Sequence, residues 1–589
     1  MTKFIKHKEK TTRLVKKLGS KAVDLQTSSS KHIGKYVTRR ARRIGDVRRF
    51  VATWIFFVVL LIVGTFAGLV QVRSKSGVNT PIAGGTYTEG IVGDVNNLNP
   101  LFSNGMVDDS ISKLLFNGLY RHDEDGRLVP DMAVNFNIDE SKKIYTVKLR
   151  DDVRWHDSQP LTAQDVVYTI GIIQNPETRS TSFASWQGVK VSQVDKLTVK
   201  FELPAPFAPF PSALTESILP SHLLKDIPAN KIRTTGFNSS PVGTGPFIFK
   251  ARRSDNIKQK KIEFSANKKY YRGSPKLSDF SIHLYPDDES LAKALESREI
   301  TAAVDLKRET ASSFKRDTSI RFVDIPLNSG VFAFYKNTSP LLGDEKIRKA
   351  LTSAINRQSV ISLFDARFAP LKTPLLSNQL GYDAKYSQVT DQKEANILLD
   401  AAGWAKDASG QRVKDGVKLE VNLITVNSAQ YSAMAGTLQK QWAAIGVKVN
   451  SQLLTLEQLQ QNGLSAHSYD VLLYGISIGY DPDVYAYWHS SQARSGGLNF
   501  SEWKSARADS SLEVARTRLE DVLRKARYET FLDEWQKSSP AVALYRPRVI
   551  YAYHQNAQGI LPVPSNNASS RLTNVEDWTV LTKNVAQTP

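Results

Sequence analysis

The sequence predicts an α/β protein with more than one lobe, because strand and helix patterns alternate along most of its length. The chain has 589 residues, enough for roughly two to four domains. Alternating apolar residues at 419–423 predict a strand, residues 429–445 a helix that ends at Gly446, and residues 447–449 a second strand. Strand, helix, glycine and strand in this order form a βαβ unit, which implies parallel pairing and a right-handed crossover.

Other segments support the same fold class. Apolar residues alternate at 145–149 and at 197–203, as expected of half-buried strands. Between them, Thr162 and Asp165 have the spacing of a helix N-cap followed by an acidic residue in the first turn. An apolar stripe at helical spacing predicts one long amphipathic helix over 512–535.

Composition and motifs favour binding over catalysis. The chain has no cysteine, which excludes disulfides, thiolate metal sites, a thiol nucleophile and a lipid-attached cysteine. The patterns HExxH, GxSxG and GxxxxGK[ST] are absent. The acidic pairs 108–109 and 287–288 could hold a cation, but we interpret them as solvated loop residues. We therefore expect no cofactor and no metal.

The formal net charge of +20 is concentrated at the amino terminus. Residues 1–49 contain 16 Lys and Arg against 3 Asp and Glu, and residues 50–72 follow with no charged residue. As a helix, residues 50–72 would measure about 34 Å, enough to cross the apolar core of a bilayer. This pattern predicts a transmembrane anchor. The alternatives are a cleaved signal peptide, whose apolar region is usually about 7–15 residues long, and a buried helix of a soluble domain.

The flanking charges also predict the orientation of the anchor. A basic flank stays on the cytoplasmic side, so we expect residues 1–49 to form a cytoplasmic tail of a single-pass protein of the cell membrane. Residues 73–83 are expected to form a flexible stalk without regular structure, and the rest to lie outside the cytoplasm. The tail has few aromatic residues that could stack on bases, and we expect no nucleic-acid partner.

Seven segments resemble, in the same order, one family: the extracytoplasmic solute-binding proteins of peptide- and nickel-type ABC transporters, bacterial extracellular family 5. The resemblance covers about 500 residues. Ser158 stands where glycine is usual in the family, a departure that affects one turn only. The segments are GGTYTEGIVGDVNNLNPLF and its continuation over 84–136, YTVKLRDDVRWHDSQPLTAQDVVYTI at 145–170, PVGTGPFIF at 241–249, YYRGSPKL at 270–277, KIRKALTSAINRQSVI at 346–361, AAGW at 401–404 and YDPDVY at 480–485.

The resemblance implies a two-lobed periplasmic-binding-protein fold of type II with an inserted third domain. A solute would bind between lobes I and II, hinge closure would bury it, and the closed form would dock on an ABC permease. The implied boundaries are 84–122, 243–325 and 546–589 for lobe I, 123–242 for the inserted domain and 326–545 for lobe II.

The resemblance also implies which segments line the cleft. They are the loop at Asn104, the segment around Trp186, the crossing into lobe II from Asn328 to Tyr335, and residues 474–487. The candidate solute contacts are Asn104, Trp186, Asn328, Tyr335, Tyr474, Tyr480, Asp481, Asp483 and Tyr485. An acidic side chain could pair with a cationic group of the solute, and it could equally cap the helix that follows.

One position departs from the peptide binders of this family. They often hold the amino terminus of the peptide with an aspartate four residues before the proline of the YDP motif, and here that position is Ile478. A buried ammonium without a carboxylate is costly, so either Asp481 replaces the missing carboxylate or the solute is not a peptide with a free amino terminus.

We therefore predict capture of a peptide or peptide-like solute for an ABC permease. The alternatives are a receptor or sensor that uses the same fold without transport and, as a third, an anchored hydrolase.

Overall fold

The computed structural model describes residues 48–75, 77–256, 259–314, 317–363, 368–561 and 563–586, and side chains are described outside 48–49, 66–79, 255–259, 308 and 583–586. Contacts divide the chain into two units, one of Pro81–Thr582 and one of Met1–Thr80 with Lys583–Pro589. The predicted basic tail, residues 1–49, lies almost wholly outside the described residues.

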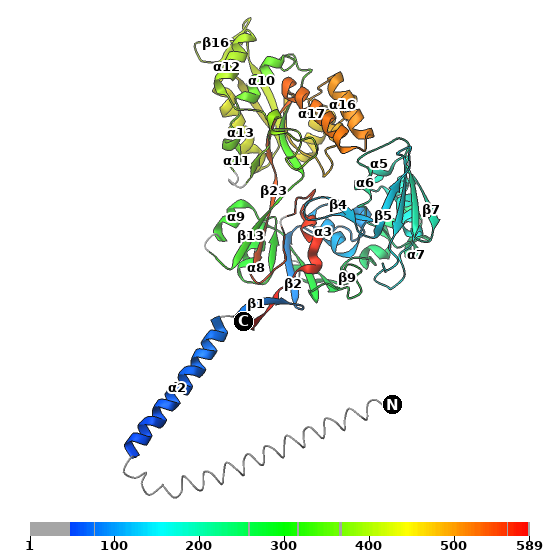
Figure 1. Ribbon diagram of the computed structural model, residues 1–589. Coiled ribbons are helices and arrows are strands. Elements are labelled where there is room, and N and C mark those ends of the chain that lie inside the picture. Colours follow the sequence, from blue (N-terminus) through cyan, green and yellow to red (C-terminus); the bar gives the residue numbers. More distant parts are fainter. Residues whose placement is uncertain are drawn as a thin grey trace. The chain divides into compact units, whose positions relative to one another are not determined.

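Helix α2, Arg48–Lys75, contains the predicted membrane span (Figure 1). The side chains of 66–72 lie outside the described residues. Within the part of the chain that the structure describes, no helix combines the length and the apolar character needed to cross a membrane. The absence of regular structure predicted for the segment after α2 is wrong at Gly77–Ile82, which forms strand β1 and pairs with β24, Leu581–Ala586. The partner strand comes from the far end of the sequence, so local composition could not indicate the pairing.

A seven-stranded mixed sheet forms the first large layer. Strand β2 lies inside it, parallel to its neighbours β11 and β12, and the remaining pairs are antiparallel. One face is covered by helices α3 and η10 and the other by α8 and α9. In sheet order the strands are β13 (Ile320–Pro326), β23 (Arg548–His554), β12 (Ala302–Val304), β2 (Thr86–Val92), β11 (Asp279–Tyr285), β10 (Gln259–Ala266) and β9 (Phe247–Asn256). The helices are α3 (Met106–Leu115), η10 (Ala568–Asp577), α8 (Asp288–Glu296) and α9 (Arg308–Ser313).

A six-stranded sheet is the second layer, and helices bury both of its faces (Figure 1). Strand β14 shows the alternation: Val331, Ala333 and Tyr335 pack on the side of α10 to α13, whereas Phe332 and Phe334 pack on the side of α16 and α17. In sheet order the strands are β15 (Ala369–Pro370), β22 (Ala541–Arg546), β14 (Ser329–Tyr335), β21 (Val471–Ser477), β19 (Glu420–Val426) and β20 (Lys448–Leu454). The helices are α10 (Glu345–Ser353), α11 (Arg357–Ile361), α12 (Gln392–Ala401), α13 (Ala429–Ala443), α16 (Ala506–Thr517) and α17 (Asp521–Ser538).

The predicted βαβ unit is confirmed in this sheet. Strands β19 and β20 are parallel and α13 connects them. Gly446 follows α13 with a φ of 86°, a left-handed conformation that glycine adopts without strain.

A four-stranded antiparallel sheet, in the order β5, β6, β8 and β7, is the third layer. Its core is not separate, because one hydrophobic cluster continues from it into the seven-stranded sheet. Helix α4, Ala163–Gln174, packs on it and starts with the predicted cap: the Thr162 N–H donates to Asp165 Oδ2 at 2.8 Å. The strands are β5 (Ala133–Ile138), β6 (Ile144–Leu149), β8 (Thr198–Glu202) and β7 (Lys190–Asp195).

Ser158 in the turn before α4 has a φ of 72°, which explains why glycine is usual there.

Shorter elements complete the fold. These elements are β3 (Tyr120–His122), β4 (Leu128–Pro130), β16 (Ala405–Lys406), β17 (Arg412–Lys414), β18 (Val417–Lys418), α5 (Phe183–Trp186), α6 (Phe210–Ala213), α7 (Ser221–Leu224), α14 (Leu456–Gln458) and α15 (Tyr485–Trp488).

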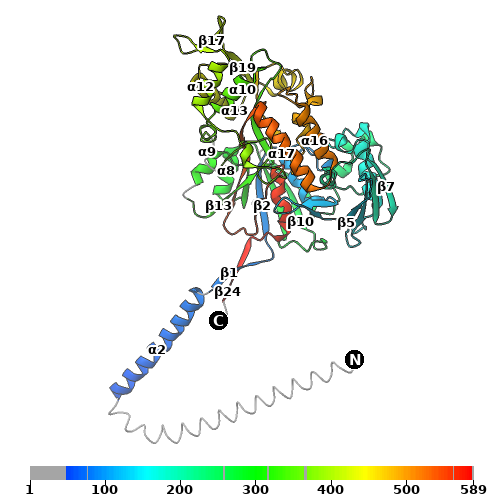
Figure 2. The same cartoon turned by 45° about the horizontal axis from the view of Figure 1, so that its top comes forward.

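The single helix predicted for 512–535 is wrong, because the chain breaks into α16 and α17 at residues 518–520 (Figure 2). Arg518 and Glu520 have extended backbone angles, with ψ of 137° and 115°. The break contains neither proline nor glycine, so the sequence carries no local signal for it. It lets both helices pack side by side on one face of the six-stranded sheet.

Two short crossings connect the six-stranded sheet to the seven-stranded one. Leu327 and Asn328 lie between β13 and β14, and Pro547 lies between β22 and β23. Arg546 fixes the two crossings to each other: its Nε donates to the Leu327 carbonyl at 2.7 Å and its Nη2 to Asn328 Oδ1 at 2.8 Å. These are the two places at which the chain passes between the two sheets.

A buried ion pair joins the central strand of the seven-stranded sheet to the helix η10 on its face. Glu89 on β2 and Arg571 on η10 are both fully buried, and Arg571 Nε donates to Glu89 Oε1 at 2.9 Å. The Tyr551 hydroxyl donates to the same oxygen at 2.7 Å, and Arg571 Nη1 donates to the carbonyl of Ala568 at 2.7 Å. The charges are therefore paired and hydrogen-bonded, the condition under which burial is tolerated.

Removing one partner of this pair is predicted to be costly. Arg571→Met leaves the Glu89 carboxylate buried without its counter-ion and should lower the free energy of unfolding by about 3–5 kcal/mol, measured by urea denaturation. The double variant Glu89→Leu/Arg571→Met should recover most of the loss. Lys293→Met, in an exposed pair with Glu289, is the matched control and should change stability by less than about 0.5 kcal/mol. An Arg571→Met protein as stable as the wild type would contradict the role assigned to the pair.

Candidate functional site

A cavity of about 250 Å³ lies where elements of the two large sheets meet. Helix α3, strand β3 and segment 566–573 line it from the side of the seven-stranded sheet. Tyr480, in the loop that follows β21 of the six-stranded sheet, lines it from the other side. We call this space the junction cavity. A solute placed in it would contact parts of the chain on both sides of the two crossings.

Tyr480 and His122 both line the junction cavity, and their rings stack on each other. Their ring centroids are 3.6 Å apart and their planes differ by 9°, and the Tyr480 hydroxyl donates to the carbonyl of Pro564 at 3.1 Å. Burial and the nearby Lys113 ammonium lower the pKa of His122 to about 4. The imidazole is therefore neutral at pH 7 and stacks without a charge.

The loop at Gly243 and Gly245 holds the end of α3 in place. The Gly245 N–H donates to the Leu115 carbonyl at 2.8 Å. A Cβ at Gly243 would lie 1.8 Å from the Leu115 carbonyl oxygen, and one at Gly245 would lie 2.3 Å from that of Leu114. Only glycine permits this approach of two backbones, so the GTG segment positions the helix that lines the cavity.

His156 supports the same loop from its other side. The Gly243 N–H donates to His156 Nδ1 at 3.2 Å. Because Nδ1 accepts, the ring proton is on Nε2, which donates to the Gly245 carbonyl at 3.1 Å. Burial lowers the pKa of His156 to about 4. A neutral imidazole thus bridges the two glycines.

Three acidic or basic side chains line the junction cavity besides His122: Asp109 and Lys113 on α3, and Arg121 on β3. Asp109 accepts hydrogen bonds from the Ser103 hydroxyl and, at 2.9 Å, from Asn567 Nδ2. Burial raises the pKa of Asp109. Among the described residues, Lys113 and Arg121 have no acceptor within hydrogen-bond or ion-pair distance.

A second cavity, of about 390 Å³, lies between the segment 184–210 and the 485–517 region. Arg516 closes it: the guanidinium lies 4.9 Å from the Phe207 ring centroid and 4.3 Å from that of Tyr485. The Ala208 N–H also donates to the Arg516 carbonyl at 2.7 Å. Arg516 therefore joins the four-stranded-sheet region to helix α16.

Asn328, one of the predicted contacts, is buried at the first crossing. Its side-chain oxygen accepts from Arg546, and its Nδ2 donates to Asn566 Oδ1 at 3.1 Å. Its carbonyl accepts from the N–H groups of Ile478 and Gly479 at 2.8 and 2.9 Å. Its polar groups are thus used to join the crossings to the loop that carries Tyr480.

Both predicted acidic contacts are already paired with arginines. Asp481 accepts two hydrogen bonds from Arg524 Nη2, at 2.7 and 2.8 Å, and Asp483 lies 3.0 Å from Arg516 Nε. An ammonium group of a solute would have to displace Arg524 from Asp481. With Ile478 at the position of the usual aspartate, both carboxylates of this loop are ion-paired with arginines, and Asp483 Oδ1 is the oxygen left without a hydrogen-bond partner.

The other predicted contacts lie at different places. Tyr480 lines the junction cavity and Tyr485 the second cavity. Asn104 is exposed, and its N–H donates to Asp108 Oδ2 at 3.2 Å. Two are buried, Trp186 against Phe201 and Phe210, and Tyr335 in the six-stranded sheet with its hydroxyl 3.3 Å from Thr352; Tyr474 is half-buried beside Phe500. Their contact with a solute stays a prediction.

Sequence reasoning did not single out Lys113, Arg121 or His122. All three fall in the segment 84–136, which carries the resemblance. The position of Lys113 near the end of a helix does not by itself indicate a binding site, because a lysine in the last turn of a helix is also a favourable partner of the helix dipole. Only the fold brings α3, β3 and Tyr480 to one cavity.

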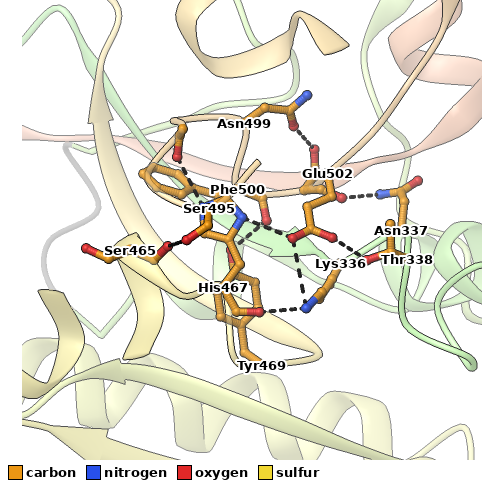
Figure 3. Close-up of polar contacts among 12 residues, drawn as sticks. Lys336, Asn337, Thr338, Ser465, His467, Tyr469, Ser495, Asn499, Phe500 and Glu502 are labelled. Atoms are coloured by element: carbon orange, nitrogen blue, oxygen red, sulfur yellow. Dashed lines mark hydrogen bonds and ion pairs between the residues drawn. The ribbon is translucent and has the colours of Figure 1, made fainter. Parts of the chain in front are cut away.

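Polar residues in the loops beside β21 form a separate network (Figure 3). His467 is fully buried and has a φ of 51°; its Nδ1 lies 3.2 Å from Glu502 Oε1. Lys336 Nζ donates to the His467 carbonyl at 2.7 Å, and the Tyr469 hydroxyl donates to the Phe500 carbonyl at 2.6 Å. The network fixes the long connection from β21 to α16, which carries Tyr480 and Tyr485.

The acidic pairs 108–109 and 287–288 are not solvated loop residues throughout. Asp108 and Asp288 are buried, and they accept from the N–H groups of Asn96 and Lys307, each at 2.9 Å. Asp287 caps α8. Among the described residues, no group of three or more His, Asp or Glu side chains is placed to hold a metal ion.

The chain belongs to the bacterial extracellular solute-binding proteins, family 5, whose profile matches residues 127–497. The resemblance to the solute-binding proteins of peptide- and nickel-type ABC transporters is thereby confirmed. Membership places the chain among extracellular solute-binding proteins and not among enzymes.

Individual relatives agree with this assignment. The oligopeptide-binding protein AppA of Bacillus subtilis is 27% identical over 521 residues, which are 86% of this chain and 93% of that protein. Its structure with a nonapeptide matches with a TM-score of 0.67 at 26% identity, covering 85% of this chain and all of that one. The structure of NikZ from Campylobacter jejuni with Ni(L-His) matches with a TM-score of 0.68 at 26% identity, covering 84% and 99%. The predicted α/β fold class is confirmed.

The neutral histidines predict how stability depends on pH. The pKa of His156 is about 4 in the folded chain and about 6.5 unfolded, so between these values the unfolded chain binds a proton that the folded chain does not. The contribution of the neutral His156 to the free energy of unfolding is fully present above pH 6.5 and is lost as the pH falls towards 4. The free energy of unfolding should therefore decrease over this window, and less steeply in His156→Gln, measured by urea denaturation at several pH values. An equal slope in both proteins would contradict the neutral bridge.

Proposed function

We propose that this chain captures a peptide or peptide-like solute between two lobes built on the seven- and six-stranded sheets, and delivers it to an ABC permease. The observation that carries the proposal is the junction cavity, because a solute there is contacted from both sheets and would favour the closed arrangement. Binding energy from both sides is what drives hinge closure, and the crossings at Asn328 and Pro547 are the hinge in this proposal.

Relatives support the solute class. The structure of the Bacillus subtilis relative contains a nonapeptide, and a dipeptide-binding protein of Escherichia coli K12 is 25% identical over 500 residues. The NikZ structure contains nickel with histidine. A metal chelate is less favoured for this chain, because no cluster of metal ligands occurs among the described residues.

Tyr480 is predicted to contribute to solute affinity through its ring. Isothermal titration of the full-length chain in detergent with a random tetrapeptide pool should give saturable heat. Tyr480→Ala should weaken binding by about tenfold or more, because it removes a buried aromatic contact and the stack on His122. Tyr480→Phe keeps the ring and loses only the hydroxyl, and it should bind within about threefold of the wild type.

Two outcomes would count against the proposal. Absence of heat with every peptide, alongside binding of another solute such as nickel–histidine, would exclude the peptide class. Unchanged affinity in Tyr480→Ala would exclude the junction cavity as the solute site.

We propose in addition that α2 remains in the mature protein as its membrane anchor, with residues 1–49 in the cytoplasm. The support is the uncharged run 50–72 behind a strongly basic segment, and the exposure of the apolar side chains of α2, such as Phe57 at 62% and Leu61 at 68%. Exposed apolar side chains along a helix need an apolar environment.

The anchor predicts that the protein stays with membranes. After carbonate washing of membranes from the native cell, the chain should remain in the pellet and should retain its amino-terminal residues by mass spectrometry. A matched variant in which Leu60, Leu61 and Ile62 are changed to aspartate should be released, since each charge at the centre of a span costs about 2.5–3.5 kcal/mol. A mature chain that begins after residue 72 would show cleavage instead.

A further inference from the structure

Two side chains of the junction cavity carry a positive charge that the described part of the protein does not neutralise. Lys113 projects from the last turn of α3 and Arg121 from β3, and both line the cavity. Among the described residues, neither makes a hydrogen bond or an ion pair. Two buried nitrogens of Arg121, Nε and Nη1, have no acceptor. Charged donors without partners in a shielded place are costly, and folded proteins seldom keep them without a reason.

The two acidic groups nearby, Asp131 and Glu576, form ion pairs with Arg272. Asp131 accepts from the Tyr271 hydroxyl at 2.7 Å and from Arg272 Nη1 at 3.3 Å. Glu576 is paired with the same arginine, whose Nε donates to Oε1 at 2.9 Å, while Oε2 of Glu576 is buried without a hydrogen-bond partner. Arg272 thus lies between two carboxylates, and these lie beyond ion-pair distance of Lys113.

Asp109, the one carboxyl group that lines the cavity, is also engaged. It accepts from Ser103 and Asn567, both neutral donors. Burial raises the pKa of Asp109. The hydrogen bond from Ser103 lowers this pKa, and the repulsion from Asp108 raises it again. The one carboxyl group of the lining is therefore hydrogen-bonded through both oxygens to neutral donors and pairs with neither Lys113 nor Arg121.

The two cations also disfavour each other. Burial lowers the pKa of Lys113, and the charges of Arg272 and Arg121 lower it further, against the opposite effect of Asp131 and Glu576. Lys113 in turn lowers the pKa of His122. A group that pairs with Lys113 and Arg121 together would relieve this repulsion and satisfy the free donors.

We infer that the junction cavity binds the anionic group of the solute, with Lys113 and Arg121 as its counter-ions. Resting on the proposed function, the inference specifies the solute class: a peptide would enter with a carboxylate, either its carboxyl terminus or an acidic side chain. It also accounts for Ile478 and for the pairing of Asp481 with Arg524, since this site is built for the negative end of a solute and not for a free ammonium. Charge-assisted hydrogen bonds of this kind are about twice as strong as neutral ones.

The test compares three chemical forms of one probe. Random tetrapeptide pools with a free carboxyl terminus, with a carboxyl-terminal amide, and with an acetylated amino terminus are titrated into the full-length chain in detergent. The free acid should bind about tenfold or more tightly than the amide, whereas acetylation should change affinity by less than about threefold. Equal affinity of acid and amide, when the pools bind, would overturn the inference.

Variants assign the effect to the two side chains. Lys113→Met and Arg121→Gln keep most of the side-chain length and should each reduce the preference for acid over amide to about threefold or less. Lys293→Met and Arg527→Gln, at exposed positions outside the lining of the cavity, are the matched controls and should keep the preference. A preference that is unchanged in Lys113→Met and in Arg121→Gln would overturn the assignment of the two counter-ions.

A second measurement separates the inference from the peptide proposal. If no pool binds in any form, the peptide proposal fails, and the inference is judged by melting temperature in glutarate, inorganic phosphate or chloride at equal ionic strength. Glutarate or phosphate should raise the melting temperature of the wild type and not that of the double variant Lys113→Met/Arg121→Gln. A response to phosphate alone would identify a phosphorylated solute as the source of the charge. An equal rise in both proteins would overturn the inference.

Discussion

The arrangement of this protein depends on two short crossings that Arg546 fixes to each other. The chain from β14 to β22 is covalently connected to the seven-stranded sheet through Leu327–Asn328 and Pro547. Arg546 has no carboxylate partner among the described residues, and burial lowers its pKa to about 10. Its charge is met by the carbonyl of Leu327 and the side chain of Asn328. Because these acceptors belong to the opposite crossing, the hydrogen bonds of Arg546 hold the two crossings together.

The same crossings position the candidate site. The carbonyl of Asn328 accepts from Ile478 and Gly479, directly before Tyr480, so the crossing sets where the aromatic ring enters the cavity. On the other side, the contact of the GTG loop with the end of α3 places Lys113. The cavity is therefore built from backbone contacts that tolerate little displacement, which would suit a site that forms again at each closure in the proposed function.

The acidic and the basic side chains around these contacts have different roles. The acidic side chains of the YDPDVY segment serve the packing of α16 and α17, through Arg516 and Arg524, and the break between these helices brings the two arginines within reach. The unpaired charge that remains near the junction is positive. A loop whose sequence suggests recognition of a cation thus contributes to structure, and the two basic side chains for which we propose a role in solute binding, Lys113 and Arg121, lie on α3 and β3.

The sequence by itself determined the fold class, the βαβ unit, the cap of α4 and the family, because these depend on local periodicity, local hydrogen bonds and motifs in a fixed order. It also predicted Tyr480 and Asn328 as solute contacts, and this stays a prediction. The tertiary structure alone decided the strand β1, the break between α16 and α17 and the pairing of Asp481 and Asp483 with arginines. It also decided that Lys113 and Arg121 share one cavity. Each of these depends on a partner distant in sequence, and no local pattern encodes such a partner.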